Sequence, residues 1–171
     1  MVEFALVLPL FMLLVFGVIE FGVTYNNYIT VRQGTREAAR QGAVGVFGPA
    51  VSSSCSLTGS TGASTDMQQL MCLAKNQIGL NAANTRVMIL SGNSSFSGSG
   101  TFAEGDSLII CAMYPVDKTA AFVSPVVGGA VLKTKASMRI ETTYTTQETG
   151  GAETPLSGTN WNWCTVSGAA P

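Results

Sequence analysis

The stretch MVEFALVLPLFMLLVFGVIEFGVTY, residues 1–25, decides the fold of this chain. Sixteen consecutive uncharged and almost wholly apolar residues lie between Glu3 and Glu20. As a helix this run is about 24 Å long, slightly short of a hydrocarbon core of about 30 Å, and the residues up to Tyr25 supply the missing length. A surface helix has one apolar stripe, whereas this segment is apolar on every side. We therefore predict a helix that lies in lipid, or in the core of an assembly that replaces lipid.

A cleavable secretory signal is the first alternative for this stretch. Such a signal has a basic start and a small-residue cleavage site, but here the first basic residue is Arg32 and no A-x-A box follows the apolar run. A plain single-pass anchor is a second interpretation. Glu3 favours a third, in which this helix packs against copies of itself. A carboxylate in an apolar helix is costly unless a cation neutralises it, and the nearest cation is an α-amino group. We predict that Glu3 is paired with such an amine, most directly that of an adjacent copy.

The helix is predicted to continue to about residue 42, where glycines and Pro49 end it. Pro9, Gly17 and Gly22 lie inside it, although proline costs a helix interior about 3 kcal/mol and glycine about 1. Membrane helices tolerate both residues, but the three also favour a weak point where the helix departs from α geometry. About forty residues make roughly 60 Å, so the second half of the helix projects beyond a membrane.

Arg32, Arg36 and Arg40 are spaced four apart in this second half and therefore share one helical face. A solvated face near the negative end of the helix dipole is one interpretation. Contact with acidic headgroups or with a neighbour's carboxylate is the other. Together with Glu20 at the far end of the apolar run, the three arginines are candidates for residues that take part in assembly.

Two segments, VEFALVLPL at residues 2–10 and FGVIEFG at residues 16–22, resemble the opening of the TadE-like pilins and pseudopilins of tight-adherence (Flp) pili, relatives of type IV pilins. The resemblance covers about residues 2–45. It implies a precursor whose basic leader is cut by a prepilin peptidase. It also implies a subunit that pilus assembly machinery moves from the bacterial inner membrane into a helical surface filament of identical copies. Such families usually place the glutamate four residues after the cut, whereas Glu3 has two residues before it. Processing therefore differs here, or Met1 is not the mature start.

The remaining residues, 46–171, are predicted to form one extracytoplasmic domain on this helix of residues 1–45. A chain of 171 residues is long enough for a real core beside the helix. The net charge of −1 gives no indication of a nucleic-acid partner. Histidine is absent, which removes the commonest general base and metal ligand. We expect no cofactor and no bound metal.

The four cysteines all follow the apolar helix, which indicates two disulfides in an oxidising compartment. A zinc site is less favoured because no C-x2–4-C pair is present. Four cysteines allow three pairings, and we predict Cys55–Cys72 and Cys111–Cys164. Cys55 lies in a loop that leads directly into the helix bearing Cys72. Cys111 lies in a strand from which it can face the tail, where Cys164 and two tryptophans need an anchor.

A second helix is predicted over residues 67–78, with Thr65 and Asp66 as its cap and Gly79 at its end. Its apolar stripe, which we expect to pack on a sheet, consists of Leu70, Leu73, Ala74 and Ile78. Three antiparallel strands are predicted at residues 86–90, 107–115 and 132–145. The fold class is therefore α+β: a long N-terminal hydrophobic helix, as in pilins, and a small domain of one helix packed on an antiparallel sheet.

Two connections in this domain carry further predictions. Residues 92–100 form a polar turn region, in which Asn93 matches the N-glycosylation pattern. Residues 120–129 form a loop or short helix that buries Phe122 and Val123.

The sequence contains no recognisable catalytic motif, so we expect the protein not to be an enzyme. Glu104 and Asp106 lie in a turn and Asp117 follows Tyr114, where solvated carboxylates are ordinary; no Walker loop or G-x-S-x-G elbow is present. Three functions remain. The chain is a structural subunit of an adhesive filament, a low-copy minor pseudopilin that primes or tips the pilus, or a membrane-tethered binding domain that never polymerises.

Overall fold

The computed structural model describes residues 2–48, 55–59, 62–92, 102–116, 129–144 and 148–164. Of the predicted connections, residues 93–100 with Asn93, and residues 120–128 with Phe122 and Val123, lie outside this range, as does Asp117. The elements follow in the order α1 (Val2–Ala43), α2 (Thr65–Ile78), β1 (Arg86–Ser91), β2 (Ser107–Pro115), β3 (Val131–Arg139) and β4 (Gly151–Ala152).

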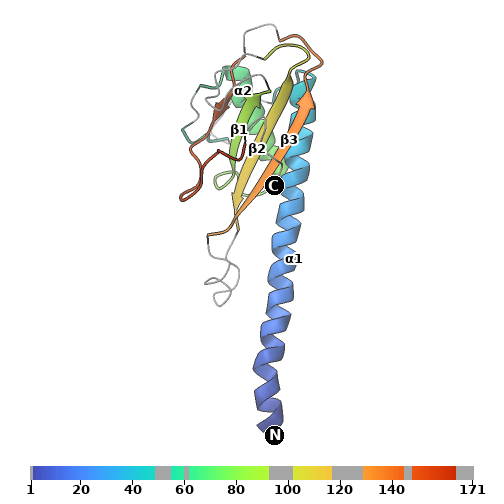
Figure 1. Ribbon diagram of the computed structural model, residues 1–171, viewed down its shortest axis with the longest axis vertical. Coiled ribbons are helices and arrows are strands. Elements are labelled where there is room, and N and C mark those ends of the chain that lie inside the picture. The colour runs from blue at the N-terminus through green and yellow to red at the C-terminus, as the bar shows by residue number, and fades with distance from the viewer. Residues whose placement is uncertain are drawn as a thin grey trace.

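The four strands form one antiparallel sheet in the order β3-β2-β1-β4. The sheet and α2 lie against the upper end of α1, and the N-terminal part of α1 extends far beyond them as a single rod (Figure 1). The predicted α+β class, a long apolar helix joined to one helix and an antiparallel sheet, is confirmed.

The strand predictions were right for β1 and β2 and wrong in two other places. The third strand ends at Arg139 instead of residue 145, because Arg139 pairs with Ser107, where β2 begins, and no strand of the described residues pairs with the chain beyond that point. The chain then turns to α1, where the Glu141 N–H donates to the Ala43 carbonyl at 3.0 Å and the Tyr144 hydroxyl donates to the Gly42 carbonyl at 2.9 Å. The two-residue strand β4 was not predicted, since it has too few residues for a periodic pattern.

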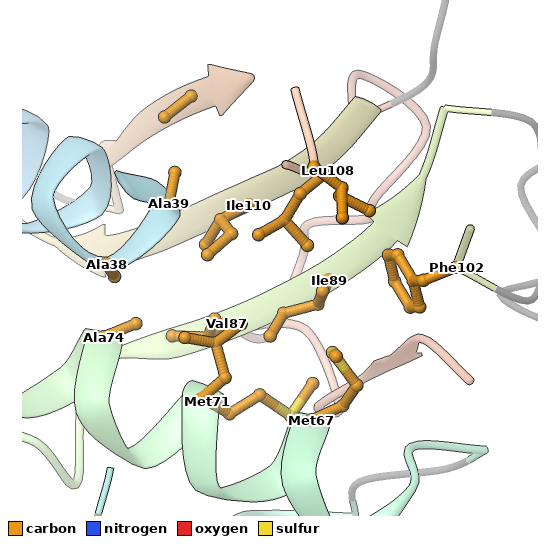
Figure 2. Close-up of a cluster of buried hydrophobic side chains, with 13 residues drawn as sticks. Ala38, Ala39, Met67, Met71, Ala74, Val87, Ile89, Phe102, Leu108 and Ile110 are labelled. Atoms are coloured by element: carbon orange, nitrogen blue, oxygen red, sulfur yellow. The ribbon is translucent and has the colours of Figure 1, made fainter. Parts of the chain in front are cut away.

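The main core lies between the two helices and one face of the sheet (Figure 2). Alternate residues of a strand point to opposite faces, so β1 supplies Val87 and Ile89 to this core and β2 supplies Leu108 and Ile110. The helices contribute small residues from α1 and larger ones from α2. The buried helical members are Ala38, Ala39, Met67, Leu70, Met71 and Ala74.

The opposite face of the sheet is covered by the C-terminal segment, which is why β1 and β2 are buried at nearly every position. Met88, Ile109 and Cys111 on this face pack against Trp161 and Cys164. The Cys111–Cys164 disulfide joins the tail to β2, with Cα atoms 6.1 Å apart. The Cys55–Cys72 disulfide joins the preceding loop to α2, with Cα atoms 5.7 Å apart. Both pairs are those predicted from the sequence.

The helix α2 begins at Thr65 and its N-cap is Ser64, one residue before the predicted cap. The Ser64 hydroxyl does not cap the helix but donates to the buried carboxylate of Glu148. The helix ends at Gly79, as predicted, where a φ of 66° favours glycine. Three residues of the predicted stripe are fully buried, and Leu73 is partly buried against the same core.

A buried ion pair joins α2 to the C-terminal segment. The Lys75 ammonium lies 2.6 Å from the Glu153 carboxylate, and both side chains are almost fully excluded from solvent. Glu153 also accepts hydrogen bonds from the N–H groups of Thr58 and Val87, each at 2.8 Å. The indole N–H of Trp161 donates to the Glu153 carbonyl at 2.8 Å. The Glu153 side chain thus connects α2, the disulfide-bonded loop and β1, and its backbone carbonyl binds Trp161 in the tail.

Candidate assembly surface

The N-terminal half of α1 exposes its apolar side chains in every direction. Phe4 is 72 % exposed and Phe21 is also 72 % exposed, values normally seen for charged side chains. A continuous exposed apolar surface of this length indicates contact with lipid or with another protein. The exposed large residues of this half are Phe4, Leu6, Val7, Leu8, Leu10, Phe11, Met12, Leu13, Leu14, Phe16, Val18, Ile19, Phe21, Val23 and Tyr25.

The helix is α-helical without interruption from Val2 to Ala43, with Pro9 inside it. The predicted departure from α geometry between Pro9 and Gly22 is therefore absent from the single chain. A proline removes one backbone donor, and the other hydrogen bonds of so long a helix can hold its geometry around that gap. At Gly17 and Gly22, no described part of the chain outside the helix backbone lies within 4 Å of where a Cβ would be, so both can face a neighbouring helix.

The two acidic residues of this half lie far apart along the helix. Glu3 belongs to α1, but its side chain lies outside the described part, so the predicted pairing with an amine stays a prediction. Glu20 is partly covered and makes contacts within the chain. Seventeen residues separate the two, about 26 Å of helix, so they cannot act as one site within a single copy.

The three predicted arginines are all exposed on the C-terminal half of α1, but they are not equivalent. The Arg40 guanidinium lies 2.7 Å from the Glu37 carboxylate, which neutralises it. Arg32 and Arg36 make no ion pair or side-chain hydrogen bond with the described residues. The unpaired positive charge of this face therefore belongs to Arg32 and Arg36.

The rigid junction between α1 and the globular part depends on residues that were not singled out from the sequence. At Gly34 a Cβ would lie 2.6 Å from the backbone of Ile78, so only glycine lets α2 approach α1 this closely. The buried Thr35 hydroxyl donates to the Val31 carbonyl at 2.7 Å and lies 3.0 Å from the Thr134 hydroxyl on β3. The Glu37–Arg40 pair was not predicted either, although its i,i+3 spacing is a local signal that could have indicated it, whereas the Gly34 contact has no local signal.

Of the two turn carboxylates that resemble an acid–base pair, Asp106 holds the turn. Gly105 has a φ of 90°, and the Asp106 carboxylate accepts a hydrogen bond from the Ala103 N–H at 3.1 Å. Glu104 is exposed beside them. This is the arrangement of an ordinary turn, in which aspartate holds the backbone.

A cavity of about 150 Å³ lies beside the end of α1, lined by residues that include Phe47, Asp66 and Tyr144. Burial raises the pKa of the Asp66 carboxyl above its usual range, and the charge of Glu148 adds to the shift. Burial likewise raises the pKa of Tyr144 to about 12, again with a contribution from Glu148. These groups link Asp66 of α2 to Tyr144 and Glu148.

Length and composition make the segment Leu6–Ala43 of α1 capable of crossing a membrane. The sequence model of the family described as TadE-like protein matches residues 1–40, which are nearly the whole of α1. This N-terminal segment is TadE-like. The resemblance recognised in the sequence is thereby confirmed for this segment, which is less than a quarter of the chain. No curated protein and no solved structure matches the chain.

The TadE-like match covers the helix and not the domain that it carries. An apolar N-terminal helix that is TadE-like in sequence fits a membrane-anchored protein. The β-sheet domain with its two disulfides is attached to that helix without a flexible joint, since Val31, Ala38 and Ala39 of α1 belong to the cores of the globular part.

Proposed function

We propose that this protein is a structural, non-catalytic subunit that polymerises through α1 into a Tad-type pilus on the bacterial surface, where the filament serves adhesion. The observation that carries the proposal is the exposed apolar half of α1, which extends beyond a folded domain. Before assembly the inner membrane covers this half. In the filament, the same halves of neighbouring copies cover one another.

The rigid junction supports polymerisation over simple tethering. A tethered binding domain needs only an anchor and a linker, whereas here one helix is both the apolar rod and part of the core. When such rods bundle, each domain takes a fixed position around the bundle. Association of apolar helices depends on packing and not on hydrophobicity, because lipid is already apolar. Gly17 and Gly22, which have open space around them, allow the close helix approach that such packing needs.

Electron microscopy of material sheared from cells that produce the protein tests the proposal. We expect filaments in which this chain is the most abundant component. Filaments that contain only traces of the chain would instead indicate a minor pseudopilin that primes or tips the pilus. Retention of the whole chain in the membrane fraction, with no filaments, would indicate a tethered domain. A precursor cut by a prepilin peptidase and handled by the pilus assembly machinery is expected in the first two cases.

The predicted role of Glu3 has its own test. We expect Glu3→Gln to reduce filament yield strongly while the amount of subunit in the membrane stays unchanged, because the neutral side chain cannot pair with a neighbour's amine. Pairing a charge in a low-dielectric core is worth several kcal/mol relative to leaving it unpaired. Glu37→Gln is the matched control, since it removes a carboxylate from the same helix outside the apolar half. Normal assembly of Glu3→Gln would contradict the role of Glu3 and leave polymerisation itself standing.

A further inference from the structure

Two oppositely charged patches lie at different heights along the axis of α1. The basic stripe consists of Arg32 and Arg36. The acidic corner consists of Glu104, Asp106, Arg139 and Glu141, whose three carboxylates and one guanidinium leave a net charge of −2. The two patches are different surfaces of the same copy, which is the arrangement that a head-to-tail contact between copies requires.

The basic stripe is unpaired but firmly placed. Arg32 and Arg36 are exposed on α1 and have no ionic partner among the residues that the structure describes. The helix beneath them is fixed to the domain by Gly34 and Thr35, which contact α2 and β3. The two guanidinium groups are one helical turn apart and are therefore presented together on one face.

The acidic corner is held by backbone hydrogen bonds between the turn before β2 and the end of β3. The Gly105 N–H donates to the Ile140 carbonyl at 2.9 Å, and the Ile140 N–H donates to the Asp106 carbonyl at 2.8 Å. The groove between the two segments has a volume of about 250 Å³, and its charged lining residues are Glu104, Glu141 and Arg139, so the carboxylates outnumber the guanidinium by two to one. Neither of these two glutamates has an ionic partner within the described part of the chain. The groove therefore offers carboxylates to which a guanidinium can bind in bidentate fashion.

The axial distance between the patches follows from one hydrogen bond. The Glu141 N–H donates to the carbonyl of Ala43, so the corner lies at the level of the last residue of α1, where the end of β3 meets the upper end of the helix (Figure 1). Arg36 and Arg32 precede Ala43 by seven and eleven residues. At about 1.5 Å per residue, they lie about 10 Å and 16 Å below the corner.

We propose that the basic stripe of one copy binds the acidic corner of the next copy, and that this contact fixes an axial step of about 10–16 Å between neighbouring subunits. The proposal rests on the proposed function, because it requires copies with parallel α1 helices. Sliding one copy along the other by this step brings Arg32 and Arg36 level with Glu104 and Glu141. A contact between unlike patches does not close on itself and continues as a helical filament.

Distance along α1 favours a second copy over lipid headgroups as the partner of Arg36. The apolar run ends near Tyr25, and a headgroup layer adds about 5–8 Å to each side of the hydrocarbon core. Arg36 follows Tyr25 by eleven residues, about 16 Å of helix, and therefore lies beyond that layer when the helix is upright. Only Arg32 is within reach of a headgroup.

Charge reversal tests the contact in the full chain. We expect Arg32→Glu with Arg36→Glu, and separately Glu104→Lys with Glu141→Lys, to abolish filaments, since each places like charges opposite one another. The four changes together should restore filament yield. Arg86→Glu is the matched control, because the Arg86 guanidinium bonds backbone carbonyls on a different part of the domain. Thermal unfolding of each variant establishes that the domain is folded.

Cysteine cross-linking gives a second measurement that does not depend on yield. Two tagged versions are produced in one cell, one with Arg36→Cys and the other with Glu141→Cys. All four natural cysteines are paired, so the introduced thiols are the only ones that can react. We expect a disulfide between the two tagged chains in filaments and none between chains dispersed in detergent.

The outcomes separate this inference from the proposed function. If the unaltered chain forms no filaments, the proposed function fails and the contact fails with it. If both reversed variants assemble like the unaltered chain, or if the fourfold variant is not restored and no cross-link forms, the contact is wrong while polymerisation stands. If only the arginine variant fails, and it has lost binding to vesicles of anionic phospholipid, the partner of the stripe is lipid and the inference is overturned.

Discussion

Replacing Glu153 by Gln should unfold this domain more readily than any other single loss of charge. In the native chain its carboxylate accepts hydrogen bonds from Lys75 at 2.6 Å and from two backbone N–H groups at 2.8 Å. The amide oxygen can still accept from Lys75 and Thr58, which share Oε1, but the amide nitrogen then faces the Val87 N–H, and the Lys75 ammonium loses the negative charge that neutralises it. Removing one member of a buried pair costs about 3–5 kcal/mol, because the other charge stays buried. That is a large part of a typical stability of about 5–15 kcal/mol.

The dependence of this loss on pH identifies its cause. Burial lowers the pKa of Lys75 below its usual range, and the hydrogen bond and charge of Glu153 oppose that shift. In Glu153→Gln the negative charge that opposed this shift is gone, so the pKa of Lys75 falls further. Between the lowered folded pKa and the ordinary value the unfolded chain binds one proton more than the folded chain, and the free energy of unfolding therefore rises with pH. The variant should regain stability as the pH is raised from 7 towards 10.

Denaturant unfolding of the full chain in detergent measures both quantities, with tryptophan fluorescence as the signal. Trp161 is a suitable reporter because its indole N–H binds the Glu153 carbonyl. Glu141→Gln, at an exposed carboxylate, is the control and should change the stability by less than about 0.5 kcal/mol. A loss for Glu153→Gln no larger than that of the control would refute the reasoning. So would a loss that does not change between pH 7 and pH 10.

Three further predictions concern the junction, the tail and the upper end of the domain. Gly34→Ala should cost about 1–3 kcal/mol in thermal unfolding because its Cβ meets the backbone of α2, whereas Gly22→Ala, with open space around it, should not destabilise the chain. Cys111→Ser with Cys164→Ser should cost about 4 kcal/mol and expose the tail tryptophans to a fluorescence quencher. Asp66→Asn should raise stability at pH 7. The carboxyl has a raised pKa when folded, so its stabilising contribution is complete below the ordinary value near 4 and is lost as the pH rises through the folded pKa. The midpoint of unfolding, measured as a function of pH, checks this. The difference in midpoint between Asp66→Asn and the unaltered protein should become smaller as the pH falls.

The elements that could be predicted are those with a local signature. The apolar run from Phe4 and the glycine that ends α2 at Gly79 each depend on residues within a few positions, and the structure has them where the pattern indicated. The disulfide partners followed from the order of elements along the chain, because a loop next to its helix and a tail in need of an anchor leave one sensible pairing.

The parts that could not be predicted depend on residues far apart in the sequence. Lys75 and Glu153 are 78 positions apart, and nothing in the sequence around either residue indicates its partner. Glu148 is similar, since its partner Ser64 is 84 positions away. The end of β3 at Arg139 was missed because it is set by the start of β2 and not by the alternating sequence of β3 itself, which continues past that point.

Because α1 is unbroken in the single chain, a departure from α geometry near Pro9 can arise only when the helix packs against something else. In the single chain, α1 keeps α geometry through Pro9, Gly17 and Gly22, although these residues cost the helix about 3 kcal/mol and about 1 kcal/mol each. The helix keeps α geometry unless contacts outside it stabilise a different backbone geometry more strongly. The large apolar side chains of this half are exposed, whereas the junction at Gly34 is fixed by α2. Any departure from α geometry must therefore come from packing against other copies, and it can shorten or lengthen the rod without disturbing the domain. The same helix can then fit both a membrane and a filament while the charged patches keep their spacing.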